Sequence, residues 1–166
     1  RLWFVMPWYE GETLETRLRR TKLTRAEAFE IFEPLAHALA AMHAAGIRHQ
    51  DVKPENIFLA RLAGHGRSAV LPVLLDLGVA SPEAEIVIAG TPTYFAPEVA
   101  TLFVARPPFE PVTPKADVFA LALALRNALE PETELVPEEG SPIEDFVARR
   151  AEAMPPLPRD PGLAYL

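Results

Sequence analysis

The chain contains no cysteine among its 166 residues. This absence excludes disulfide bonds and thiolate-ligated metal sites, because both require the cysteine sulfur. Disulfides form in oxidising compartments, so a chain without cysteine fits a reducing one. We therefore expect a cytoplasmic protein, whose parent chain is either free or tethered to a membrane through segments outside this sequence.

The sequence also lacks a long apolar run and a cluster of basic residues. No stretch approaches the roughly 20 consecutive apolar residues that a membrane-spanning helix needs, so direct membrane insertion is not expected. The formal net charge is −7, whereas nucleic acids are bound through clustered cations, so no nucleic-acid partner is expected. Because the chain starts at Arg1 with neither methionine nor a signal-like segment, we expect it to be cut from a longer protein.

What the chain does contain is the composition of a globular domain. Apolar residues make up 49% of it, and its length suits a single domain with a hydrophobic core. It also holds 18 prolines, many of them after residue 106, which predict kinked connections and an irregular C-terminal third.

Polar side chains that could take part in a chemical reaction are concentrated in the string HQDVKPEN, residues 49–56. Asp51 can accept a hydroxyl proton, Lys53 can steady a transferred phosphoryl group, and Asn56 offers a neutral oxygen to a hard cation. Asp76, in the string Asp-Leu-Gly, would bring a carboxylate to the same cation from a separate turn. These groups at this compact spacing are what phosphoryl transfer from a metal nucleotide requires.

Four ordered motifs carry a resemblance to a known family. HQDVKPEN resembles the HRDxKxxN catalytic loop of protein kinases, and Asp-Leu-Gly at 76–78 resembles their DFG motif. GTPTYFAPE at 90–98 is similar to the loop ending in APE, and DVFALALAL to the helix that follows it. From Arg1 to about Leu129 the chain resembles the C-terminal lobe of a eukaryotic-type Ser/Thr protein kinase, since the Lys-Pro-Glu-Asn form is typical of that class rather than of tyrosine kinases.

The resemblance implies a mainly α fold, with a short hinge strand and small β-hairpins that bear the catalytic and metal-binding loops. It implies ATP and Mg²⁺ as cofactors, protein serine or threonine hydroxyls as substrates, and the protein's own N-terminal kinase lobe as partner. Within a single domain, 1–12 would be the strand end and hinge, 13–130 the core of the lobe, and 131–166 an irregular proline-rich part. Without the N-terminal lobe, which should precede Arg1, we expect the chain alone to be inactive.

The resemblance also assigns roles to single residues. The implied catalytic group comprises Asp51 as base, Lys53, Asn56 and Thr91, and the implied magnesium ligands are Asn56 and Asp76. The residues implied around the adenine base are Met6 as gatekeeper, Pro7 and Tyr9 of the hinge, and Leu14 and Phe58 beneath the base. Those implied to give structural support are His49, Glu98 and Asp117, of which Asp117 would accept hydrogen bonds from the backbone near His49. Simpler alternatives are an ordinary strand end for the hinge, a core aromatic for Phe58 and helix-dipole complementarity for Asp117.

Hydrophobic periodicity predicts a long helix in the first third of the chain. Thr24 and Glu27 have the spacing of a capping box, and apolar residues at helical spacing then continue over 25–45 until Gly46. An interior proline bends a helix or makes it restart, so Pro34 predicts a kink near Glu30.

Further elements are shorter. Strands are expected over 57–59 and 70–75, joined by an exposed turn at 61–68 of unknown function. Thr113 as N-cap and Pro114 at the first helical position predict the start of a helix buried at the centre of the lobe, and 143–153 predicts one more amphipathic helix. The remaining histidines, which lack metal-ligand spacing and are expected to be structural or exposed, are His37, His43 and His65.

Two departures from the family pattern fall in its regulatory switch. Gln50 replaces the usual arginine before the catalytic aspartate, and Val87 stands four positions before Thr91, where a phosphorylated threonine often lies. The two losses agree, because a buried arginine without its phosphate would be an unpaired charge. We hypothesise an activation loop held by the apolar residues 86–88, with no required phosphate on Ser81, Thr91 or Thr93. The weak arginine candidates for pairing with Glu98 are Arg149, Arg150 and Arg159.

Two other functions stay open at this point. A pseudokinase acting as a binding scaffold is suggested by Gln50 and Leu77, although the intact aspartates, lysine and asparagine oppose it. A small-molecule kinase of the aminoglycoside or choline type shares the HxD loop but normally lacks the APE segment and the Lys-Pro-Glu-Asn string.

Overall fold

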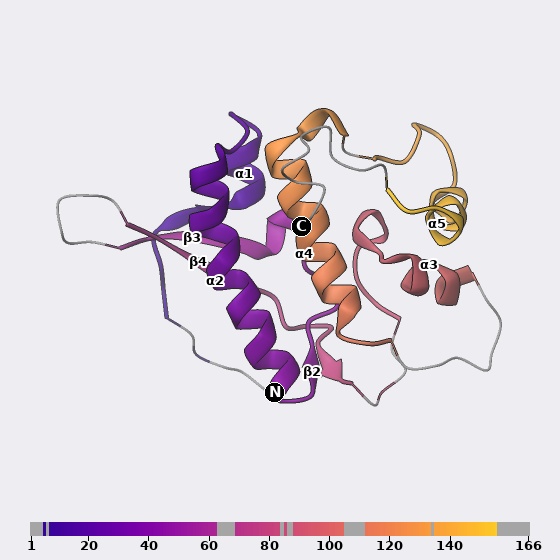
Figure 1. Ribbon diagram of the computed structural model, residues 1–166, viewed down its shortest axis with the longest axis horizontal. Coiled ribbons are helices and arrows are strands. Elements are labelled where there is room, and N and C mark those ends of the chain that lie inside the picture. The colour runs from indigo at the N-terminus through magenta and orange to yellow at the C-terminus, as the bar shows by residue number, and fades with distance from the viewer. Residues whose placement is uncertain are drawn as a thin grey trace.

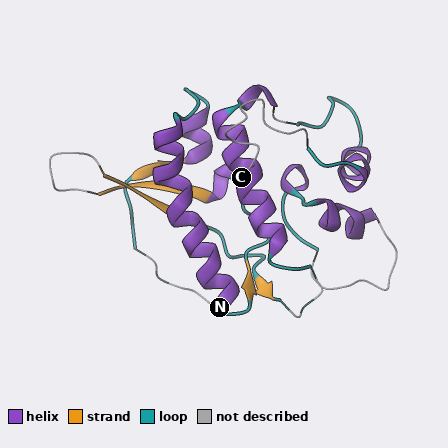
Figure 2. Cartoon of the chain, in the orientation of Figure 1, coloured by secondary structure: helices purple, strands orange, loops and turns teal. Residues whose placement is uncertain are grey.

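A computed structural model of the chain describes residues 5, 7–62, 69–83, 85, 88–104, 112–133 and 135–155. Predictions that fall on residues 1–4, Met6, 63–68, Ile86, Val87 and Arg159 lie outside the described residues. The described part is mainly helical, with two small antiparallel sheets (Figures 1 and 2), which agrees with the expected fold class. None of its helices is long and apolar enough to cross a membrane.

Two long helices form the centre of the lobe. Helix α2, Arg25–Ala44, lies beside α4, Lys115–Leu129, and both contribute to one hydrophobic core (Figure 1). The predicted capping box starts α2, with the Glu27 carboxylate accepting the Thr24 N–H at 2.8 Å and the Thr24 hydroxyl accepting the Glu27 N–H at 3.3 Å. The helix continues through Pro34 as one element, so the restart that the sequence allowed does not occur.

The start of α4 differs from the prediction. Pro114 is the N-cap, Lys115 is the first helical residue, and no side chain caps the helix, so the prediction of Thr113 as N-cap was wrong. The physical reason is a tight backbone turn, in which the Thr113 carbonyl accepts the Ala116 N–H at 3.1 Å. Backbone carbonyls therefore bind the first N–H groups that the threonine hydroxyl was expected to satisfy.

The larger sheet has three strands. Its strands are β1, Gly11–Thr13, β3, Ile57–Leu62, and β4, Ala69–Leu74, in the order β1-β3-β4. The β3–β4 hairpin confirms the two predicted strands, and its register pairs Ile57 with Leu74. Strand β1 leads directly into the short helix α1, Leu14–Leu18.

The smaller sheet is a two-residue ribbon. Strand β2, Ile47–Arg48, pairs with β5, Ser81–Pro82, and joins the residues before the catalytic string to the chain that follows Gly78. Strands this short have no periodicity for the sequence to display, which is why neither was predicted.

A second, smaller core lies beside the first. Helix α3, Pro97–Val104, packs against α5, Ile143–Glu152, which matches the predicted helix over 143–153 (Figure 1). Short 3₁₀ turns span Pro54–Asn56, Pro92–Tyr94 and Pro131–Thr133. The buried residues of this core are Phe95, Ala96, Val99, Ala100, Val112, Phe146 and Val147.

Candidate functional site

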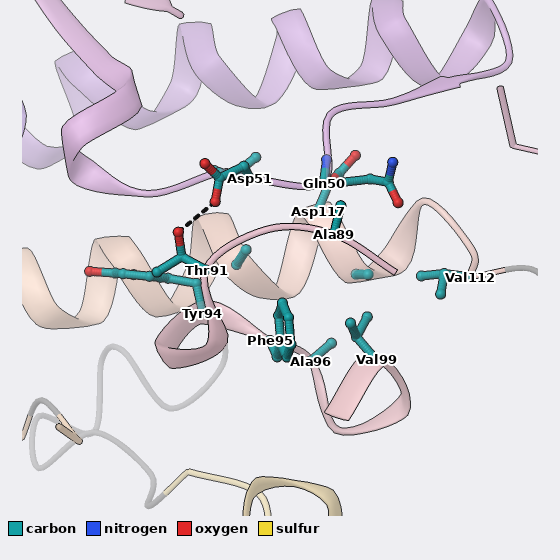
Figure 3. A pocket seen from close by; sticks show the side chains of 13 residues that line it. Gln50, Asp51, Ala89, Thr91, Tyr94, Phe95, Ala96, Val99, Val112 and Asp117 are labelled. Carbon is teal, nitrogen blue, oxygen red and sulfur yellow. Dashed lines mark hydrogen bonds between the residues drawn. The ribbon is translucent and has the colours of Figure 1, made fainter. Parts of the chain in front are cut away.

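The Asp51 carboxylate lies at the centre of a polar network between β2 and β3. Its Oδ1 accepts a hydrogen bond from the Thr91 hydroxyl at 2.7 Å, the contact drawn in Figure 3. Its Oδ2 forms an ion pair with Lys53 Nζ at 2.9 Å. The same ammonium group donates to the Thr91 hydroxyl at 2.6 Å, so these three side chains form a closed triangle.

This network keeps Asp51 ionised. Burial by itself raises the pKa of the Asp51 carboxyl, but the hydrogen bonds from Lys53, Thr91 and Asn56 and the charge of Lys53 outweigh burial and hold that pKa below its usual value. Asp51 is therefore an anion at neutral pH and is equipped to accept a hydrogen bond from a hydroxyl group.

Asn56 faces Asp51 with its amide nitrogen. That nitrogen donates to the Asp51 carboxylate at 2.9 Å and to the Asp51 backbone carbonyl at 2.8 Å. Because both donors of the amide are used, the orientation of the group is set, and its oxygen is the atom left for a cation.

Asp76 reaches the same end of the sheet from β4. The Leu75 N–H donates to the Asn56 carbonyl at 2.7 Å, which continues the β3–β4 ladder by one pair. Asp76 directly follows this pair, at the same end of the sheet as Asn56. Asp76 has a left-handed φ of 62°, a conformation that aspartate tolerates, and its Oδ1 accepts the Gly78 N–H at 3.0 Å. The side chain itself is exposed.

The oxygen set of Asn56 and Asp76 fits magnesium. One neutral oxygen and one carboxylate match the preference of Mg²⁺ for few protein ligands, with waters and phosphates completing the octahedron. No group of three or more His, Cys, Asp or Glu side chains among the described residues could hold a metal by itself. A cation here would depend on a bound phosphate group as well as on the protein.

Asp117 supports the catalytic loop from α4. Its carboxylate is only 2% exposed and accepts the backbone N–H groups of His49 at 2.8 Å and of Gln50 at 2.7 Å. The contact implied for this residue is therefore present. His43 Nε2 of α2 donates to the same carboxylate at 2.9 Å, so three segments of the chain meet at one buried group.

His49 is a fully buried link between the two loops. Its Nε2 donates to the Leu75 carbonyl at 3.0 Å, and its Nδ1 accepts the Asp51 N–H at 3.3 Å. One neutral tautomer, with the proton on Nε2, satisfies both bonds. The ring thus joins the residue before Asp76 to the backbone of Asp51.

Gly90 brings the second loop into close contact with the catalytic loop. Its φ is 107°, and a Cβ atom at this position would lie 2.1 Å from the Gln50 carbonyl oxygen. Gln50 itself has a left-handed φ of 68°, which costs a non-glycine residue roughly 1–2 kcal/mol. The N–H bond to Asp117 and the two bonds of the Gln50 side chain, to the Val79 carbonyl and the Ser81 hydroxyl, hold this conformation.

A small cavity lies beneath the catalytic loop (Figure 3). Its volume is about 20 Å³, which is enough for a water molecule. Gln50 and Asp51 border it from one loop, Thr91 from the other, and Asp117 from α4. The cavity thus lies between the two loops and the helix that supports them.

The residues predicted around a nucleotide base are only partly surface residues. Pro7 is exposed, Tyr9 is half-buried, and Phe58 is half-buried on β3. Leu14 has 0% exposure and packs in the main core, so it supports β1 and β3 and has no surface left for a ligand. The predicted gatekeeper, Met6, lies outside the described residues.

Glu98 has none of the predicted arginine partners within the described part of the chain. Its side chain is exposed on α3, whereas Arg149 pairs with Glu138 at 3.7 Å. Arg150 is instead buried, with its guanidinium over the rings of Phe119 and Phe146 and a hydrogen bond to the Thr93 carbonyl. Neither of these two weak candidates therefore pairs with Glu98, because both are bound elsewhere.

Two residues of the site were missed in the sequence. His43 was expected to be merely structural or exposed, yet it binds the carboxylate that supports the catalytic loop. Arg48 was not singled out, yet it is completely buried next to His49. The only available signal for His43 was that it is a polar residue near the end of a long helix, six positions before His49. No feature of the sequence pointed to Arg48.

The chain is similar in sequence to known proteins. A family model described as a protein kinase domain matches residues 1–155. Serine/threonine-protein kinase PkaB of Streptomyces coelicolor is 38% identical over 75% of this chain and 30% of its own length. Serine/threonine-protein kinase PknJ of Mycobacterium tuberculosis is 33% identical, with 99% and 27% covered. Serine/threonine-protein kinase pkn2 of Myxococcus xanthus is 32% identical, with 94% and 18% covered. The chain spans less than a third of the length of each of these relatives.

Proposed function

Since this chain belongs to the family of protein kinase domains, we propose that it is the C-terminal lobe of a Ser/Thr protein kinase. The proposed reaction transfers the γ-phosphoryl group of Mg-ATP to a serine or threonine hydroxyl of a protein substrate. The three relatives are each named as serine/threonine-protein kinases. The observation that carries the proposal is the closed triangle of Asp51, Lys53 and Thr91.

Asp51 would receive the substrate hydroxyl. Because its pKa is held below the usual value, Asp51 is a weak base, and its first contribution is to orient the hydroxyl toward the phosphorus. The proton moves to Asp51 late, as the new oxygen–phosphorus bond forms and the bond to the leaving diphosphate breaks. Such a role suits phosphoryl transfer, in which positioning and electrostatic stabilisation contribute most of the rate.

Lys53 would act beside this carboxylate. Its ammonium group is held by Asp51 and by Thr91, which supports a role in stabilising negative charge on the transferred group. The cation stabilises that charge without having to reorganise during the reaction.

Magnesium would be held by the oxygen of Asn56 and the carboxylate of Asp76. When bound, it neutralises charge on the nucleotide phosphates. Tyr9 and Phe58 are the proposed contacts to the adenine base, together with Met6 and the backbone of Pro7, while Leu14 supports them from the core. An N-terminal lobe of the same protein would supply the rest of the nucleotide site.

The test uses the full-length protein that contains this chain. Transfer of labelled γ-phosphate to a generic Ser/Thr substrate is measured for the unaltered protein, for Asp51→Asn and for Asp145→Asn, whose aspartate is exposed on α5. We expect Asp51→Asn to lose roughly 100-fold or more in turnover, since general base catalysis contributes about that much. Asp145→Asn should retain the activity.

Two results would contradict the proposal. Equal turnover of Asp51→Asn and Asp145→Asn would remove Asp51 from the reaction. No transfer by well-folded protein, across several substrates and with manganese added, would favour the scaffold function of a pseudokinase.

A further inference from the structure

Arg48 is a buried cation next to the catalytic loop. It lies on β2, immediately before His49, and is 1% exposed. Its guanidinium donates to four oxygen atoms of other chain segments. These are the Val112 carbonyl at 2.7 Å, the Ser81 hydroxyl at 3.0 Å, the Pro82 carbonyl at 3.2 Å and the Glu85 carbonyl at 2.6 Å.

Among the residues that the structure describes, no carboxylate pairs with this charge. None of the ion pairs between described residues includes Arg48, and all four of its acceptors are neutral. A buried charge is tolerated only when it is paired or extensively hydrogen-bonded. The carbonyl groups at 82, 85 and 112 therefore have to stay directed at Arg48, which restrains the backbone that carries them.

Gln50 acts on the same segment from the other side of His49. Its side-chain amide donates to the Val79 carbonyl at 2.6 Å and to the Ser81 hydroxyl at 2.9 Å. Arg48 and Gln50 thus converge on Ser81, which is itself 6% exposed. The chain that follows Asp76 is joined to the catalytic loop at four consecutive or nearly consecutive residues, Val79, Ser81, Pro82 and Glu85.

We propose that Arg48 is a positioning residue that anchors residues 79–83, Glu85 and the chain at Val112 to the catalytic loop, without a phosphate group. This inference rests on the proposed kinase function and deepens its regulation. The charge expected at residue 50 is absent there, and the guanidinium of Arg48 supplies it two residues earlier. Neutral backbone carbonyls take the place of the phosphate that would otherwise organise the loop.

Two further observations support this assignment. The Ser81 hydroxyl is enclosed by the side chains of Arg48 and Gln50, so another kinase cannot reach it while the segment is in place. In addition, the buried Nε of Arg48 has no hydrogen-bond partner within the described part of the chain. An unsatisfied buried donor costs stability, and such a cost is typical of a residue kept for function rather than for folding.

The first test compares Arg48→Met with Arg48→Lys in the full-length protein. Methionine keeps much of the length of the side chain but has no donor. We expect faster amide hydrogen exchange over residues 79–85 and a loss in kcat on the order of 100-fold, because small displacements of catalytic groups have effects of that size. The KM for ATP should change much less, since the anchored segment is not among the proposed contacts to the adenine base.

Arg48→Lys and a control variant complete the first test. Lysine keeps the charge but has three donors on one nitrogen, so it cannot reach all four oxygens, and its exchange and kcat should lie between those of arginine and methionine. Arg19→Met is the control, because Arg19 is exposed and its side chain pairs with Glu15 alone among the described residues. Exchange and kcat of Arg48→Met equal to those of Arg19→Met would overturn the proposal.

The second test removes phosphate from the unaltered protein. Phosphatase treatment, verified by the mass of the intact protein, should leave kcat and the exchange of residues 79–85 unchanged. A loss of activity or of protection would overturn the proposal even if Arg48→Met failed to fold. If the protein transfers no phosphate at all, hydrogen exchange still decides on the Arg48 anchor, and the kinase proposal fails separately.

Discussion

The hydroxyl group of Thr91 lies 2.7 Å from Oδ1 of Asp51, although 40 positions separate the two residues in the chain. The same hydroxyl accepts a hydrogen bond from Lys53 at 2.6 Å. A hydroxyl group can accept and donate at the same time, which a methyl group cannot. Thr91 therefore joins the cation and the anion of the site and orders both.

Replacing Thr91 by valine tests this link. Thr91→Val keeps the shape but removes the hydroxyl, so Asp51 loses a donor and Lys53 loses an acceptor. A hydrogen bond to a charged group contributes about 1.5–3 kcal/mol, which corresponds to roughly a 10- to 100-fold loss in kcat. Thr91→Ser, which keeps the hydroxyl, is the control. Turnover as high in the valine variant as in the serine variant would exclude the link.

Lys53 is expected to control the ionisation of Asp51. Burial raises the pKa of Asp51, and the hydrogen bond and charge of Lys53 are among the effects that lower it. In Lys53→Met the pKa of Asp51 should therefore rise, which NMR titration of the labelled carboxyl carbon would detect. The exposed Lys22→Met serves as control and should leave that pKa where it is.

The same shift has a consequence for stability. A carboxyl whose folded-state pKa is depressed stabilises the fold above its unfolded pKa of about 4, and the contribution is lost as pH falls through the lower folded value. Lys53→Met should reduce this contribution. Acid unfolding monitored by circular dichroism should consequently begin at a higher pH in Lys53→Met than in Lys22→Met, and coincident curves would contradict the explanation.

Asp117→Asn should destabilise the lobe. The buried carboxylate accepts three hydrogen bonds, from the backbone of His49 and Gln50 and from the His43 ring. An amide group would turn an NH₂ toward one of these donors and remove the charge, and disrupting a buried charged group of this kind costs about 3–5 kcal/mol. Urea unfolding measures the effect beside Asp145→Asn. A difference below about 1 kcal/mol, the size of one ordinary hydrogen bond, would show that Asp117 does not support the loop.

Gly90→Ala should reduce turnover through a direct collision. The new Cβ would lie 2.1 Å from the Gln50 carbonyl oxygen, so the catalytic loop has to move. A displacement of that kind is expected to cost on the order of 100-fold in kcat. Gly140→Ala is a matched control, because Gly140 has a positive φ of 80° but nothing within 4 Å of its Cβ position. Similar kcat values for the two variants would contradict an effect of the collision on turnover.

Asp76→Asn should weaken the use of magnesium. The exposed carboxylate is the only charged member of the proposed pair of ligands, and an amide keeps the shape without the charge. We expect the Mg²⁺ concentration for half-maximal transfer to rise roughly tenfold or more. Asp145→Asn should show no change, and an unaltered magnesium dependence of Asp76→Asn would exclude Asp76 as a ligand.

The amino-acid sequence by itself determined the family, the mainly helical fold and the groups that meet at Asp51. The match of the kinase family over residues 1–155 confirms the first, and the helices α2 and α5 and the β3–β4 hairpin confirm much of the second. These features depend on short-range patterns. A capping box spans four residues and a catalytic string eight, so the chain displays both without any knowledge of its distant contacts.

Only the tertiary structure decided how several polar residues are paired. Thr113 does not cap α4, Glu98 has no arginine among the described residues, and Arg48 is buried rather than exposed. The acceptors of Arg48 lie 33 to 64 positions away, and the partner of His43 lies 74 positions away. A buried charge needs hydrogen-bond partners, and the convergence of distant partners on one charge is a property of the folded chain that no local pattern encodes.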